Sequence, residues 1–113
     1  MATLVTQQIS GTGLSPIYLA ASASGDKVAP DARTFLHVAC AGASASVTVT
    51  VTDTMTAEPA GAASFDPDLQ VVIEPGGGRF IGPINAERFM NQLGFADISY
   101  DETYGVEVAA FRV

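Results

Sequence analysis

The run SVTVTVTD, residues 46–53, restricts the fold more than any other stretch of the chain. Val47, Val49 and Val51 alternate with threonines at every second position, which is the side-chain period of a β-strand with one buried face. A helix would spread these valines around its circumference and could not bury them together. The chain must therefore contain a sheet with an apolar inner face and an outer face that carries threonines.

Two further stretches show strand patterns. In Thr34–Cys40, Leu36 and Val38 share one face with the terminal cysteine. Residues 69–84 contain two strand-like runs around Pro75 and three glycines, and because proline ends a ladder and glycine lets the chain reverse, we interpret them as a hairpin. These patterns favour an antiparallel β fold.

The remaining predicted elements are short. We expect strands at Thr3–Ile9 and Pro16–Ala20, a connection at Ala21–Asp31, a loop at Glu58–Asp68, and a last hairpin that joins Phe95–Tyr100 to Gly105–Val113. Asn85 can cap a short helix that ends before Gly94. The prediction is a single domain over residues 1–113, an all-β antiparallel β-sandwich of about eight short strands, jelly-roll or Greek-key-like, with one short helix near residues 85–93. Its predicted core is Leu36, Val38, Val47, Val49, Val51, Val71, Ile73, Ile98, Val106 and Val108.

Charge and composition narrow the function classes. The chain has 12 acidic residues against five Lys and Arg, and the basic residues are scattered singly, so we expect no nucleic-acid partner. No apolar run reaches membrane-spanning length and no signal peptide is apparent, so we expect no membrane partner and synthesis in a cytoplasm. Charged residues make up only 15% of the chain, below the usual quarter. Such a surface suits a protein packed against neighbours, although it also suits a monomeric sandwich.

The residues that could carry chemistry do not combine into a site. His37 and Cys40, the one histidine and the one cysteine, lie on opposite faces of one predicted strand, so they cannot pair, and we expect His37 on an outer face or at an interface. Acids gather at Asp66–Asp68 and Asp97–Glu102 in predicted turns, without the spacing of a calcium loop. Gly76–Gly78 precede a strand, which favours a turn over a phosphate cradle. We predict no enzyme, with no catalytic residue, cofactor or metal.

Several stretches together carry a family resemblance. They are RTFLHVACAG (Arg33–Gly42), IEPGGGRFIGPI (Ile73–Ile84), ERFMNQLGFADISY (Glu87–Tyr100) and VEVAAFRV (Val106–Val113). This arrangement resembles small β proteins encoded among the virion structural genes of tailed bacteriophages, especially those that infect actinobacteria. The resemblance implies a capsid decoration protein that binds the outside of the assembled capsid and stabilises contacts between capsid subunits. It also implies the major capsid protein as partner and the virion as location.

For that role we predict that neighbours are contacted by Thr48, Thr50 and Thr52, or by Phe89 and Met90 at the edge of the short helix. Small side chains lose little entropy on docking, and contacts repeated over a capsid lattice reinforce one another. We expect a homo-oligomer, with a trimer favoured. Three alternatives stay open: the threonines face solvent only, the protein is a tail or head-fibre component, or it is a small carbohydrate-binding β-sandwich module.

Overall fold

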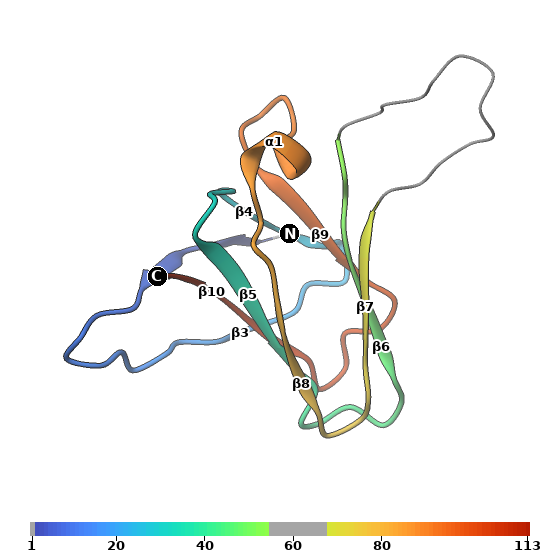
Figure 1. The fold of residues 1–113 in the computed structure, drawn as a ribbon. Helices are drawn as coiled ribbons and strands as arrows, with labels where there is room; N and C mark the ends of the chain where they lie inside the picture. The colour runs from blue at the N-terminus through green and yellow to red at the C-terminus, as the bar shows by residue number, and fades with distance from the viewer. Residues whose placement is uncertain (1, 55–67) are drawn as a thin grey trace, which may run out of the picture.

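The computed structural model describes residues 2–54 and 68–113, which form two β-sheets packed face to face with one short helix at an end (Figure 1). The elements are β1 (Ala2–Leu4), β2 (Thr6–Gln8), β3 (Leu19–Ala20), β4 (Asp26–Val28), β5 (Thr34–Ala39), β6 (Val47–Val51), β7 (Leu69–Ile73), β8 (Gly78–Ile81), α1 (Ala86–Phe89), β9 (Ala96–Tyr100) and β10 (Glu107–Arg112). Sheet A has the order β1-β4-β9-β6-β7, and sheet B has the order β2-β10-β5-β8 with β3 also paired to β10. The expected all-β sandwich is confirmed.

Strands β3 to β10 pair as a nested set around β6 and β7. β6 pairs with β7, β5 with β8, β4 with β9 and β3 with β10, and all four pairs are antiparallel. Successive pairs alternate between the two sheets, and the contacts of β6 with β9 and of β5 with β10 complete each sheet. This arrangement is a jelly roll, one of the two topologies that the sequence left open.

The strands of both predicted hairpins exist, but the two strands of each hairpin do not pair with each other. β7 belongs to sheet A and β8 to sheet B, so the turn between them crosses from one sheet to the other. That turn is fastened to the end of β5: the Gly76 N–H donates to the Cys40 carbonyl at 2.9 Å, and the Cys40 N–H donates to the Gly77 carbonyl at 2.8 Å. β9 and β10 likewise lie in different sheets.

The amino-terminal part of the chain departs most from the expectations. The single strand predicted at Thr3–Ile9 is divided at Val5, because β1 pairs parallel with β4 in sheet A and β2 pairs parallel with β10 in sheet B. The predicted antiparallel sandwich therefore has two mixed sheets. The stretch Ala21–Asp31, expected as a connection, contains β4, and the strand expected at Pro16–Ala20 is only the two residues of β3. The loop predicted at Glu58–Asp68 lies outside the described residues, apart from its last residue.

The core follows the predicted alternation. Every predicted core residue is buried except Val71, which is half-buried because β7 is an edge strand. Helix α1 lies inside the predicted range, and the Asn85 side chain caps it by accepting the Arg88 N–H at 3.0 Å. Phe89 is only 1% exposed. The prediction that Phe89 contacts neighbours at the helix edge is therefore wrong, because its ring lies in the core.

Candidate interaction surface

The groups with catalytic potential stay apart. Cys40, directly after β5, is fully buried between the sheets, where burial raises the pKa of its thiol. His37 lies on the outer side of β5, with Phe80 and Tyr18. This confirms that the two residues face opposite ways. Within residues 2–54 and 68–113, no three His, Cys, Asp or Glu side chains are grouped so as to hold a metal ion.

The acids of the predicted Asp97–Glu102 turn bind backbone N–H groups instead of forming a site. Asp101 accepts the Thr48 N–H at 2.8 Å, and Glu102 accepts the N–H groups of Thr103 and Tyr104 at 2.8 and 3.1 Å. The bonds of Glu102 are local and give the usual reason for acids in turns, whereas the bond of Asp101 links the turn to β6. Asp66 lies outside the described residues.

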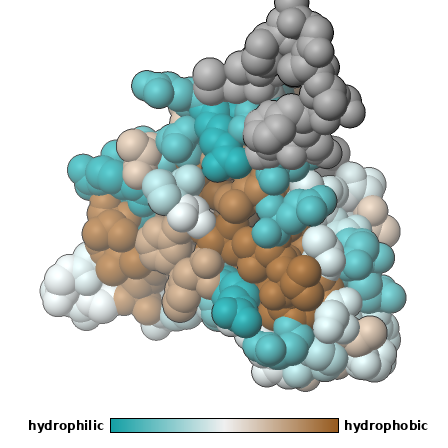
Figure 2. All heavy atoms as spheres, turned by 45° about the vertical axis from the view of Figure 1, so that its right-hand side comes forward, coloured by the Kyte–Doolittle hydropathy of each residue, from teal (hydrophilic) through white to brown (hydrophobic). Residues whose placement is uncertain are grey.

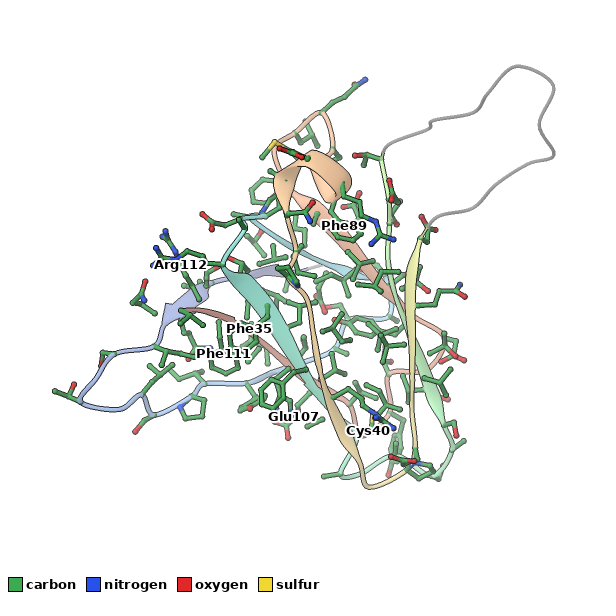
Figure 3. The ribbon with its side chains drawn as sticks, viewed as in Figure 1. Phe35, Cys40, Phe89, Glu107, Phe111 and Arg112 are labelled. Carbon is green, nitrogen blue, oxygen red and sulfur yellow. The ribbon has the colours of Figure 1, made fainter. Side chains whose placement is uncertain are left out.

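The outer face of sheet B carries an unpredicted group of rings, which we call the aromatic patch: Tyr18, Phe35, His37, Phe80 and Phe111. The register places His37 opposite Phe80 and Phe35 opposite Phe111 on adjacent strands. Figure 3 shows the labelled Phe35 and Phe111 together in the sheet, while Phe89 lies at α1 near one end of the molecule. The patch therefore comes from three strands and the segment that leads into β3.

The rings of the patch form one continuous set of contacts. The imidazole of His37 stacks on Phe80 with centroids 4.4 Å apart, and Phe35 contacts Phe80 and Phe111 at 5.8 and 5.7 Å. Tyr18 meets the edges of His37 and Phe111 at 5.6 and 6.2 Å. Offset, edge-on and stacked arrangements at these distances are favourable for aromatic pairs. The patch is therefore held as a rigid surface.

His37 is neutral within this surface. Its Nδ1 shares a hydrogen bond of 2.7 Å with the Tyr18 hydroxyl, and burial lowers the pKa of the imidazole from the ordinary 6.5. Gly78 lies so close that a Cβ atom there would be 3.1 Å from His37 Nε2. Burial thus holds the imidazole of His37 in its uncharged form.

The segment between β2 and β3 forms one wall of an apolar groove beside the patch. Gln7 holds this segment, since its side-chain amide donates to the Ile17 carbonyl at 2.8 Å and accepts the Ile17 N–H at 2.9 Å. The groove has a volume of about 270 Å³ and is lined by Ile9, Leu14, Pro16, Tyr18, Phe35, Phe80 and Phe111. Its single polar side chain, Tyr18, is already bonded to His37.

Apolar residues also reach the surface beyond this groove. A second groove of about 280 Å³ lies where β1, β2 and β3 meet β10, and it includes Leu4, Val5, Ile17 and Leu19. Figure 2 shows broad brown areas of apolar residues at the surface between the teal hydrophilic ones. Phe80 is the most exposed member of the aromatic patch, with 70% of its surface accessible. Continuous exposed apolar area of this kind is typical of interaction sites.

The predicted contact residues lie elsewhere. Thr48, Thr50 and Thr52 are half-buried on the outer side of sheet A, and Met90 is 41% exposed just after α1. Sequence reasoning missed the aromatic patch, although TFLHVAC carried a signal for it: apolar residues occupy both faces of that strand. A strand with two apolar faces is expected to be covered on both sides.

The charged residues of sheet B and its flanks balance in number, whereas those of the other described residues do not. On sheet B and its flanks, Arg79 pairs with Glu74 at 3.3 Å, Arg112 pairs with Asp31 at 3.8 Å, and Arg33 and Glu107 lie at strand ends. These are three positive and three negative groups. The other described charges are two basic residues against seven acids, namely Lys27 and Arg88 against Asp26, Asp53, Asp68, Glu87, Asp97, Asp101 and Glu102.

Comparisons with protein-family models, curated proteins and solved structures found no match to this chain. None of the helices among the described residues is long and apolar enough to cross a membrane.

Proposed function

We propose that the protein is a non-enzymatic capsid decoration protein of a tailed bacteriophage, which binds the outer surface of the assembled capsid and stabilises contacts between capsid subunits. The observation that supports this role best is the aromatic patch on the outer face of sheet B, where Phe80 is 70% exposed and the other rings are half-buried or buried, since apolar surface open to solvent often marks an interaction site. The virion assignment comes from the resemblance of the strand and turn motifs to phage structural proteins.

The two outer faces suit a protein that contacts several neighbours at once. The outer side of sheet A offers Thr48, Thr50 and Thr52, short side chains that lose little entropy when a capsid subunit docks on them. Met90 adds an exposed apolar side chain beyond α1. We assign the capsid contact to this threonine side. Repetition over the lattice allows each such contact to be modest.

Two alternatives use the same scaffold. A tail or head-fibre component would also be a rigid binding sandwich, and it differs by being present in few copies. A carbohydrate-binding module is favoured by the ring-lined groove, because sugars stack on aromatic side chains. It is disfavoured by the lack of polar groups, since Tyr18, the only polar residue that lines the groove, is bonded to His37, and sugar hydroxyls need partners.

The copy number of the protein in purified virions, relative to the major capsid protein, tests the proposal. Quantitative mass spectrometry is expected to give about one copy per capsid subunit, or one per three-fold cluster, because repeated lattice contacts imply stoichiometric occupancy. A handful of copies would support the tail or head-fibre alternative. Absence from virions would overturn the virion role.

A substitution tests the threonine side. Thr50→Lys places a long charged side chain at the centre of the threonine row, and we expect it to lower capsid occupancy in a binding assay with purified capsids. Tyr104→Lys is the matched control, because Tyr104 is 73% exposed in the loop before β10. Unchanged occupancy for Thr50→Lys would remove this face as the contact.

A further inference from the structure

The aromatic patch has a shape that suits association with itself. Phe80 projects from it with 70% of its surface exposed, and the groove of about 270 Å³ lies directly beside that ring. A protruding ring and a groove of side-chain size therefore occupy the same small surface. When two identical surfaces meet about a symmetry axis, the ring of each copy can enter the groove of the other.

The charge distribution indicates what kind of partner can approach. The chain carries a net charge of −7, so copies repel one another through most faces. The side chains that form the aromatic patch and line its groove include no charged group, since His37 is neutral. An uncharged apolar surface has no preference for a charged partner, and it is the side on which another acidic copy meets the least repulsion.

The edge strand next to the patch favours association of copies through their sheet faces and disfavours pairing of a strand from another copy with this edge. β8 is the edge of sheet B and has only four residues, with Arg79 in the strand and Pro83 shortly after it. Short length, charge and proline are features that prevent an edge from pairing with another chain. Copies are therefore expected to meet through ring contacts.

We propose that the aromatic patch is the interface between copies of this chain, and that Phe80 of each copy packs into the groove of its neighbour. The proposal deepens the proposed function, in which the oligomer sits on the capsid through the threonine side of sheet A. It assigns sheet B to contacts between copies and leaves sheet A for the capsid subunit.

Analytical ultracentrifugation of the purified full chain tests the interface without any capsid, so a failure here is distinguishable from a failure of the virion role. At about 100 μM, well above micromolar dissociation constants, the wild type is expected to sediment as an oligomer. Phe80→Asp is expected to sediment as the 11.6 kDa monomer, because burial of a carboxylate against rings is unfavourable. Circular dichroism verifies that the variant is folded.

Val72→Asp is the matched control, since Val72 is an apolar residue that is 60% exposed on the opposite sheet. It is expected to remain an oligomer. A monomeric wild type would overturn the proposal, as would an oligomer that Phe80→Asp leaves intact. A monomeric wild type whose capsid occupancy falls with Phe80→Asp would also overturn it, because the patch would then face the capsid.

Discussion

The outer faces of the two sheets show what an alternating pattern does and does not predict. In sheet A, the valines of β6 point inward and Thr48 and Thr50 point outward. Thr50 lies between Gln70 and Ser99 on the flanking strands, and Thr48 lies opposite the exposed Val72. In sheet B the inward residues are equally apolar, but rings occupy the outer side as well. A mostly polar outer face is stable in water as it stands, whereas an aromatic one gains free energy when it is covered.

The interiors of the sheets differ too. Sheet A contains a buried polar cluster around Asp26, which is fully buried and accepts hydrogen bonds from the Tyr100 hydroxyl at 2.8 Å, the Ala2 N–H at 3.0 Å and the Ser22 N–H at 3.2 Å. Through Asp26, which is in β4, these bonds connect β1 and the turn before β4 with β9. Burial and the neighbouring carboxylate raise the pKa of Tyr100, so its hydroxyl stays protonated as the donor.

The largest expected loss of stability comes from a charge on the inner side of β6, and the same charge on the outer side is the comparison. Val49→Asp should unfold the domain, because an unpaired charge in the core costs several kcal/mol out of a total stability of about 5–15 kcal/mol. Thr50→Asp, one residue along on the outer side, should cost about 1 kcal/mol or less. Thermal unfolding followed by circular dichroism measures both. Cooperative melting of Val49→Asp at the wild-type temperature would show that the faces are assigned wrongly.

A second comparison uses two phenylalanines in different settings. Phe89→Ala should lower the free energy of unfolding by about 3–5 kcal/mol, because it leaves a cavity in the core. Phe80→Ala should lower it by only about 1 kcal/mol, the value of its ring contacts. Denaturant titration at low protein concentration separates this effect from association. Equal losses for the two variants would contradict the difference in burial, which is 1% against 70% exposed.

A smaller effect is expected for the polar cluster inside sheet A. Tyr100→Phe removes one hydrogen bond to the buried Asp26 carboxylate and should cost about 1.5–3 kcal/mol. Tyr104→Phe is the control, since that ring is largely exposed. Urea titrations of both variants give the comparison, and an unchanged midpoint for Tyr100→Phe would mean that the hydroxyl contributes nothing to stability.

The smallest expected effect is the pH dependence of folding stability that His37 causes. Because burial lowers the pKa of folded His37 from 6.5, the unfolded chain binds a proton more readily, and stability falls as the pH drops below the unfolded value towards the folded one. His37→Gln lacks this dependence. Unfolding titrations at about pH 7.5 and about pH 5.5 should therefore show a greater loss for the wild type than for the variant. Parallel losses would indicate that only carboxylates titrate in this range.

Much of the fold was predictable because side-chain alternation is a local property. It correctly placed the valines of β6 and the inward residues of β5, and the capping residue Asn85 correctly placed the short helix. β4 was missed because three residues, one of them the buried Asp26, are too few to show a period. The aromatic patch was missed because its rings come from separate segments, Tyr18, β5, β8 and β10, and only the register brings them together.

The sequence by itself determined which residues of each strand face inward, since neighbouring side chains on an extended backbone must point to opposite sides. Only the tertiary structure decided which strands pair. The turn at Pro75–Gly77 looks the same whether it closes a hairpin or crosses between sheets, and its bonds to Cys40, far away in sequence, select the crossing. Pairing between distant strands depends on the whole core being buried at once, and no local pattern records that condition.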